Sequence, residues 1–170
     1  MDTDQPIPVA VWIGLGANLG ECAGALRAAL AALAALPGTG VRRVSSLYRS
    51  APVDAGGPDY LNAVAEIATT LAPQALLQAL QAIEHSAGRE RPYRNAPRTL
   101  DLDILLWGEP AVALASPTLT VPHPRMAERA FVLLPLAEIA PQRVSASALQ
   151  AVAGQRIERL APAPDWPPAT

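Results

Sequence analysis

Apolar residues along this chain are grouped into short runs and spaced stripes that predict a definite order of strands and helices. Short apolar runs bounded by turn residues predict strands at residues 8–15, 41–49, 60–69 and 99–107. Leucines at every third or fourth position predict a helix over residues 21–36. A second stripe predicts another helix that begins at Pro73 and ends at Gly88.

The predicted order of elements is β-α-β-β-α-β, which is the ferredoxin-like pattern. In this α+β fold the strands form an antiparallel sheet and both helices pack on one of its faces. Residues 108–154 then form a C-terminal extension, in which we expect a short hairpin and helical segments around 129–136 and 145–153. Because 170 residues suffice for one hydrophobic core, we expect residues 1–170 to form a single domain. Its folded core covers about 8–160, and its ends, 1–6 and the proline-rich 161–170, are mobile.

Composition narrows the class of partner. The net charge of −2 and the aromatic fraction of 4% argue against a nucleic-acid-binding surface, which needs clustered positive charge and exposed rings. All 13 basic residues are arginine, so a phosphate-binding loop that ends in Gly-Lys-Ser or Gly-Lys-Thr is excluded. We therefore expect small molecules, and no nucleic acid, as partners.

The compartment is indicated by what the chain lacks. Cys22 is the single cysteine, so no internal disulfide can form and a reducing compartment is the default. The N-terminus shows no basic and apolar signal-peptide pattern, and no apolar run has the length that a membrane span needs. We therefore expect a cytoplasmic protein that does not bind membranes. We also expect it to act as a monomer.

Three glycines, Gly14, Gly16 and Gly20, lie where the first predicted strand joins the first predicted helix. Their spacing differs from the dinucleotide-binding pattern G-x-G-x-x-G, because the third glycine comes one position late. The pattern of elements also predicts no parallel sheet. We therefore expect a tight turn with close strand–helix packing rather than a dinucleotide site.

The strongest chemical signal lies in residues 89–103. Four arginines precede two aspartates there: Arg89, Arg91, Arg94, Arg98, Asp101 and Asp103. Since side chains alternate along a strand, Asp101 and Asp103 share one face. Paired carboxylates suit Mg²⁺, and guanidinium groups bind phosphate oxygens in pairs. We predict a metal-dependent polyphosphate site; the alternative is a solvated edge strand beside a solvated loop.

Two other places carry weaker signals. Tyr60 and Asn62 share one face of the third predicted strand. They form either an ordinary half-buried sheet surface or a ring and an amide that hold a heterocycle. His123 lies in a loop between two prolines and has no partner at metal-ligand spacing; only Arg125 and Arg129 nearby hint at an anion site. The residues by themselves leave these interpretations open.

Several sequence blocks, taken in order, resemble a known family. The blocks are SSLYRS at 45–50, PDYLNA at 58–63, RNAPRTLDLD at 94–103 and LTVPHP at 119–124. With residues 14–20 and 129–131 they resemble the 6-hydroxymethyl-7,8-dihydropterin pyrophosphokinases over about residues 9–141. The resemblance implies transfer of a pyrophosphoryl group from ATP to the hydroxymethyl oxygen of the pterin, with release of AMP, in folate biosynthesis.

The resemblance also implies roles for individual residues. Asp101 and Asp103 would bind two Mg²⁺ ions, and Arg89 and Arg98 would complete the catalytic set by handling the phosphates. The pterin would contact Ser50, Ala51, Val53, Tyr60, Asn62 and Phe131, with the two rings on either side of it. ATP would contact Gln81, Glu84, Arg89, Arg91, Arg98, Ile104, Thr120, His123 and Arg129.

Two other functional classes stay as alternatives at this point. A non-catalytic pterin- or nucleotide-binding module would be expected to lack one of the two aspartates, and both are present. Another Mg²⁺-dependent nucleotidyl-transfer enzyme could place paired carboxylates on the same type of sheet. The Tyr60-x-Asn62 pair and the block around His123 argue against it.

Overall fold

The structure of the chain, a computed structural model, describes residues 6–18, 22–51, 59–89, 100–160 and 166. The strands are β1 Val9–Ala17, β2 Thr39–Val44, β3 Tyr48–Ser50, β4 Tyr60–Thr69, β5 Asp101–Trp107, β6 Leu114–Ala115, β7 Thr120–Val121 and β8 Ile157–Arg159. The α-helices are α1 Cys22–Ala34, α2 Pro73–Arg89, α3 Ala130–Ile139 and α4 Ala146–Ala151. Short 3₁₀ turns lie at Met126–Glu128 and Pro141–Arg143.

The main sheet has the strand order β5-β1-β4-β3-β8, and β2 also pairs with β4. Each of these pairs is antiparallel. The predicted order β-α-β-β-α-β is confirmed, except that its second strand consists of β2 and β3. The architecture is the ferredoxin-like α+β fold. The extension also follows the prediction, with β6 and β7 as its hairpin and α3 and α4 as its helices.

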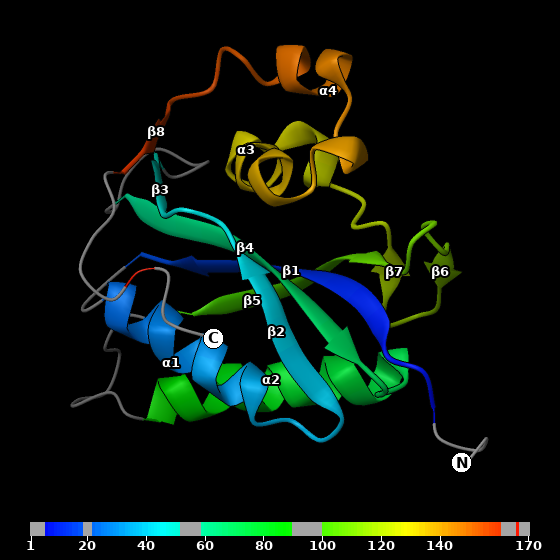
Figure 1. Ribbon diagram of the computed structural model, residues 1–170. Coiled ribbons are helices and arrows are strands. Elements are labelled where there is room, and N and C mark those ends of the chain that lie inside the picture. The colour runs from blue at the N-terminus through cyan, green and yellow to red at the C-terminus, as the bar shows by residue number, and fades with distance from the viewer. Residues whose placement is uncertain (1–5, 19–21, 52–58, 90–99, 161–165, 167–170) are drawn as a thin grey trace.

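Helices cover both faces of the sheet. Figure 1 shows α1 and α2 along one face and α3 over the opposite face. The core on the α1 and α2 side includes Val11 and Ile13 of β1 together with Leu26 and Leu80 of the helices. On the α3 side, a second core joins Trp12, Val64 and Leu105 to Val132 and Leu136. The α3 helix is therefore a third layer, added to the two layers of the ferredoxin-like unit.

Alternation along the strands decides which residues meet α3. In β5, Leu102 and Ile104 belong to the core on the α1 and α2 side. Asp101 and Asp103 take the alternate positions, and both line a cavity on the α3 side. The predicted common face of the two aspartates agrees with this arrangement.

Three features differ from the sequence-based expectations. Gly14 and Gly16 lie inside β1, so the predicted tight turn at these two residues is wrong. The predicted strand over 41–49 is two strands, β2 and β3, separated at residues 45–47. Strand β8 was not predicted, and it covers the open edge of β3. Residues 1–5, 19–21, 161–165 and 167–170 lie outside the described part.

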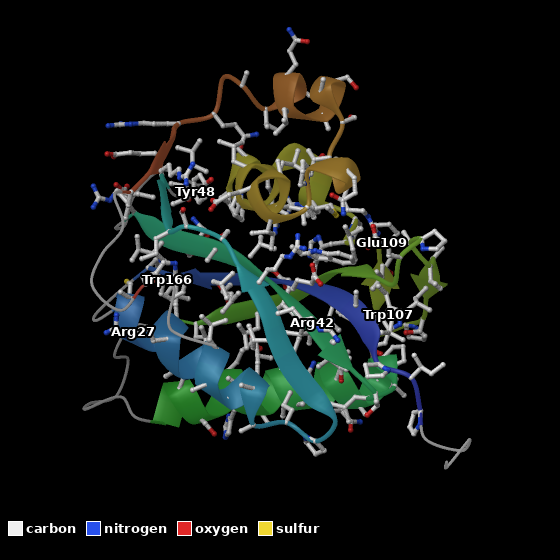
Figure 2. The ribbon with its side chains drawn as sticks, in the orientation of Figure 1. Arg27, Arg42, Tyr48, Trp107, Glu109 and Trp166 are labelled. Carbon is white, nitrogen blue, oxygen red and sulfur yellow. The ribbon has the colours of Figure 1, made fainter. Side chains whose placement is uncertain are left out.

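Trp166 is the described residue of the segment that we expected to be mobile, and it is buried. Its side chain is 5% exposed and belongs to the core on the α1 side. Its Nε1 donates a hydrogen bond of 3.0 Å to the carbonyl of Ser45. Figure 2 shows Trp166 beside α1 and Tyr48 on the α3 side of the sheet. At this residue the expectation of a mobile end is therefore wrong.

In the described residues, none of the helices combines the length and the apolar character needed to cross a membrane.

Candidate active site

A cavity of about 490 Å³ lies between the sheet and the N-terminal end of α3. This volume is in the range of pockets that hold small molecules and cofactors. Strands β1, β3, β4 and β5 contribute to its wall, as do α3 and the loop before it. Its lining residues are Gly14, Leu15, Gly16, Asn18, Ser50, Ala51, Tyr60, Asn62, Ala63, Asp101, Asp103, His123, Arg129, Phe131 and Val132.

The acidic side of the cavity is formed by Asp101 and Asp103 at the start of β5. Asp101 is exposed and Asp103 is half-buried. The strand between them is held from α2, because a carboxylate oxygen of Glu84 accepts a 2.8 Å hydrogen bond from the backbone N–H of Leu102. The two aspartates therefore present their oxygens from a strand whose backbone is fixed.

The aromatic side of the cavity is formed by Tyr60 of β4 and Phe131 of α3, both half-buried. The guanidinium group of Arg129 lies 5.4 Å from the centre of the Phe131 ring. A cation at this distance is attracted to the ring face and helps to orient the ring. The cavity thus offers two rings that can contact a flat ligand, with a cation beside one of them.

The polar edge of the cavity is formed by Asn62 and Ser50, which are 4% and 6% exposed. The amide nitrogen of Asn62 donates a 2.7 Å hydrogen bond to the hydroxyl of Ser50. This bond fixes the plane of the amide. Because the amide has a second N–H and a carbonyl oxygen, it can still donate to and accept from a ligand.

His123 stands on the acidic side of the cavity. Burial is the main cause that lowers the pKa of its imidazole; the positive charges of Arg129 and Arg125 lower it further, while Asp103 opposes the shift. The ring is therefore neutral near pH 7. Its Nδ1 accepts a 3.2 Å hydrogen bond from the backbone N–H of Arg125, so the neutral ring carries its hydrogen on Nε2. Nε2 can then donate to an anion.

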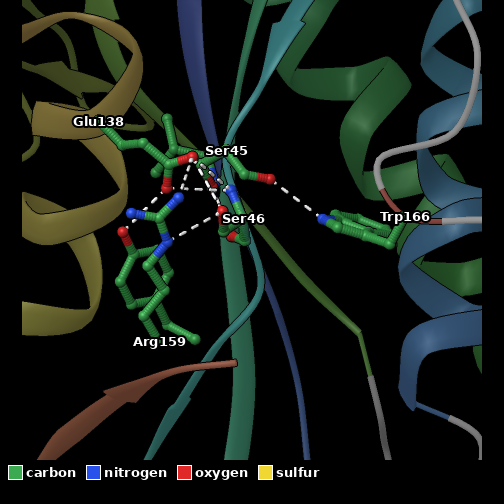
Figure 3. A network of polar contacts seen from close by, with 7 residues as sticks. Ser45, Ser46, Glu138, Arg159 and Trp166 are labelled. Atoms are coloured by element: carbon green, nitrogen blue, oxygen red, sulfur yellow. Dashed lines mark hydrogen bonds and ion pairs between the residues drawn. The ribbon is translucent and has the colours of Figure 1, made fainter. Parts of the chain in front are cut away.

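A carboxylate of α3 holds the short strand that carries Ser50 (Figure 3). Glu138 accepts hydrogen bonds from the backbone N–H of Ser46 at 3.0 Å, from the Ser46 hydroxyl at 2.9 Å and from the Tyr48 hydroxyl at 2.8 Å. Arg159 of β8 lies 3.7 Å from the same carboxylate. These contacts connect α3, which carries Phe131, to β3, which carries Ser50.

The network predicts a stability change at high pH. Burial, and then the hydrogen bond and negative charge of Glu138, raise the pKa of Tyr48 from 10.0 to about 12. Since the folded chain keeps this proton longer than the unfolded chain, the contribution of Tyr48 is complete below pH 10 and is lost as the pH rises towards 12. Thermal unfolding across this pH interval should show a smaller loss of stability in Tyr48→Phe than in the wild type. An equal loss in both proteins would contradict the assigned cause.

Some residues that the resemblance assigns to ATP lie outside this cavity. Gln81 is exposed on α2, and Thr120 is exposed on β7. Ile104 is 3% exposed and packs in the core on the α1 and α2 side, so it can offer a ligand only its backbone. Glu84 contacts the backbone of β5 instead. Val53, Arg91, Arg94, Arg98 and the side chain of Arg89 lie outside the described residues.

The structure adds residues that the sequence analysis did not assign to the site. Gly14, Gly16 and Val132 line the cavity with Asn18. The signal for the two glycines was present, because they take alternate positions in an otherwise apolar strand, where side chains of one face are expected. No such signal exists for Val132, since a valine in a predicted helix is indistinguishable from ordinary core.

The side chains of the cavity limit which metal ion it could bind. Among the residues that the structure describes, no group of three or more His, Cys, Asp and Glu side chains is placed to hold a metal ion. The two aspartates alone suit Mg²⁺ well, because this ion takes one or two carboxylates and completes its shell with phosphate oxygens and water. The same pair is a poor match for a closed structural zinc site.

A ferredoxin-like domain with a carboxylate pair and two aromatic rings in one cavity defines a class of small-molecule-binding domain. Comparison with known proteins identifies the family. The sequence profile described as 7,8-dihydro-6-hydroxymethylpterin-pyrophosphokinase matches residues 12–141. This chain belongs to that family.

Individual relatives agree with the profile. The 2-amino-4-hydroxy-6-hydroxymethyldihydropteridine pyrophosphokinase of Pseudomonas aeruginosa is 52% identical over 132 residues, which cover 77% of this chain and 80% of that protein. The enzyme of the same name from Synechocystis sp. is 43% identical over 157 residues, which cover 92% of this chain and 79% of that protein.

Solved structures agree on the fold. The Plasmodium falciparum HPPK-DHPS wild type with pterin and p-hydroxybenzoate superposes with a TM-score of 0.60 at 14% identity, over 82% of this chain. This chain spans 41% of the length of that protein. At this identity the likeness concerns the fold alone.

Proposed function

We infer that this chain transfers the pyrophosphoryl group of ATP to 6-hydroxymethyl-7,8-dihydropterin. The hydroxymethyl oxygen attacks the β-phosphorus, and the bond from that phosphorus to the oxygen bridging the α- and β-phosphates breaks. The bridging oxygen leaves with AMP, and the proton of the hydroxyl group passes to solvent. The products are AMP and the pterin diphosphate, an intermediate of folate biosynthesis.

The observation that carries this proposal is one shared cavity. Asp101 and Asp103 line the same cavity as Tyr60, Asn62 and Phe131. A ring held by the aromatic side chains would therefore lie next to the carboxylates that suit metal-bound phosphate. Pyrophosphoryl transfer requires mainly that the two substrates be positioned together and that negative charge be stabilised.

The described residues have distinct proposed tasks in the reaction. Tyr60 and Phe131 hold the pterin ring, and Asn62 reads its edge by donating and accepting hydrogen bonds. Arg129, which lies against Phe131, and His123, which is neutral with its hydrogen on Nε2, donate to phosphate oxygens. As the family resemblance implies, we expect Arg89, Arg91 and Arg98 to bind phosphate oxygens as well.

We propose Mg²⁺ as the metal held by Asp101 and Asp103. When bound, the ion supplies positive charge that polarises the phosphates. The carboxylates supply the anionic oxygen that Mg²⁺ prefers. The expected number of two ions rests on the resemblance to the family.

The proposed reaction is tested by the dependence of AMP release on each component. AMP should form from ATP only when both 6-hydroxymethyl-7,8-dihydropterin and Mg²⁺ are present. Omission of the pterin serves as the control for simple ATP hydrolysis. AMP formation at the same rate without the pterin would contradict the proposal, and absence of AMP with all components present would favour a non-catalytic binding module.

The two rings give a separate prediction for pterin binding. Tyr60→Ala and Phe131→Ala should each weaken pterin binding by roughly 1–3 kcal/mol, the cost seen when a stacked base loses its aromatic partner. Titration calorimetry with the pterin and with a non-hydrolysable ATP analogue measures both affinities, and the affinity for the ATP analogue should change much less. The reverse order of effects would mean that these rings serve the core instead of the pterin.

The proposed setting is the cytoplasm, with the chain acting as a monomer. The dependence on ATP and the single cysteine suit a reducing compartment. Sedimentation of the purified protein tests the monomer directly.

A further inference from the structure

The floor of the cavity is a stretch of β1 without side chains. Val11, Ile13 and Leu15 of this strand contribute to the core on the α1 and α2 side. The alternate positions that face the cavity are occupied by Gly14 and Gly16, and both line it. The strand thus contributes only backbone to the part of the site where its side chains would otherwise project.

The register places this bare stretch between the two halves of the site. Gly16 pairs with Asp101 of β5 on one side and with Asn62 of β4 on the other. Gly14 pairs in the same way with Asp103 and Val64. Since neighbouring strands lie about 4.8 Å apart, the carboxylate pair and the amide of Asn62 project from strands separated by about 10 Å.

The backbone itself does not require glycine at these positions. Among the described residues, the glycines with positive φ are Gly38 and Gly108, so Gly14 and Gly16 have ordinary strand conformations. A Cβ atom at residue 16 would lie 3.2 Å from Oδ1 of Asn62, which is a tight contact. At residue 14 it would lie 3.4 Å or more from the side chain of Leu105, which is an ordinary contact. Space, rather than chain conformation, is what the two glycines provide.

We propose that Gly16 is a specificity-determining residue that admits the bicyclic ring, and that Gly14 keeps the adjoining space open for the phosphates. This inference rests on the proposed function. A ring that contacts Asn62 at one edge and brings its hydroxymethyl group to the carboxylates must cross β1 above Gly16. A methyl group there would occupy the floor and press on the amide that reads the ring.

The test is the substitution Gly16→Ala, compared with Gly40→Ala. Gly40 also lies in a strand, β2, but nothing stands within 4 Å of the position of its Cβ. Gly16→Ala should raise the dissociation constant for 6-hydroxymethyl-7,8-dihydropterin at least about tenfold, an effect within the usual cost of overpacking a tight site. Its melting temperature should stay close to that of the wild type, because the amide of Asn62 needs to move by only a few tenths of an ångström and alanine restricts the unfolded chain more than glycine does. Gly40→Ala should bind the pterin as the wild type does.

The outcomes separate this inference from the proposed function. If Gly16→Ala binds the pterin with wild-type affinity, the inference is wrong and the proposed function stands. If Gly16→Ala melts well below Gly40→Ala, the fold itself needs the glycine, and the inference is also wrong. If the wild type does not bind the pterin, the proposed function and the inference fail together.

Gly14→Ala gives an independent arm, since its added methyl group meets only an ordinary contact. Gly14 is paired with Asp103, so the methyl group would take space beside the carboxylates that the phosphates need, and we expect AMP release to fall at least about tenfold. Pterin binding should change much less. Wild-type turnover in this variant would remove Gly14 from the proposal.

Discussion

Replacement of Asp101 or Asp103 by asparagine is expected to lower the rate of AMP release by orders of magnitude. Asparagine keeps the shape of the side chain but removes one negative charge from the proposed metal site. Because Mg²⁺ prefers anionic oxygen, the variant would hold the ion, and with it the phosphates of ATP, less firmly. Steady-state AMP release at saturating Mg²⁺ measures the effect.

Thermal stability distinguishes this catalytic role from a structural one. Without metal, both variants should unfold at the same temperature as the wild type or slightly above it, because one of two neighbouring negative charges is gone. Glu158→Gln removes a negative charge on exposed strand β8, where Glu158 lies 3.9 Å from Arg49, and serves as the control for the loss of a surface charge outside the cavity. Lower stability with near-normal turnover in the aspartate variants would instead assign the pair a structural role.

The second large effect is expected for Arg98→Ala, which should lower kcat/KM by at least a factor of roughly 100. A loss of this size is typical when one positioned hydrogen-bond donor is removed from a preorganised active site. The prediction rests on the sequence and the family, since Arg98 lies outside the described residues. Pterin affinity should change little, because the proposed partner of Arg98 is phosphate.

Arg42→Ala is the matched control for this variant. Arg42 lies on β2 (Figure 2). Its side chain is exposed and does not belong to the residues that line the cavity. It should keep wild-type kcat/KM, so any general effect of removing an arginine is measured separately. If the Arg98→Ala enzyme turns over normally but binds the pterin weakly, Arg98 contacts the pterin and not the phosphates, and its assignment is wrong.

The sequence was sufficient for those parts of the molecule that local periodicity reports. The alternation of side chains along β5 placed Asp101 and Asp103 on one face of the strand. The intervening apolar residues, Leu102 and Ile104, belong to the core on the opposite face. The same reasoning found the ferredoxin-like order of elements. In these segments, burial of apolar side chains decides the structure, and its period is visible in the sequence.

Glycines mark the first limit of this reasoning. Gly14 and Gly16 have no side chain that shows which face is buried, and their spacing was interpreted as a turn. The structure shows them as strand residues opposite Asp103 and Asp101. Their alternate spacing signals one face of a strand without side chains, but what that face adjoins follows only from the neighbouring strands.

Contacts between distant parts of the chain mark the second limit. Glu138 bonds to Ser46, 92 residues earlier, and Trp166 bonds to Ser45, 121 residues earlier. Neither pairing follows from the local pattern around its members. These contacts hold residues 45 and 46, which lie between β2 and β3. The local sequence is compatible with a continuous strand, and for this reason one was predicted there.

We infer that this chain transfers a pyrophosphoryl group and not a single phosphoryl group. Phosphorus NMR of one reaction mixture with ATP, Mg²⁺ and 6-hydroxymethyl-7,8-dihydropterin identifies the products directly. AMP and a pterin that carries two linked phosphorus atoms should form in equal amounts. Formation of ADP with a pterin monophosphate, or of AMP with free pyrophosphate and unchanged pterin, would contradict the inference.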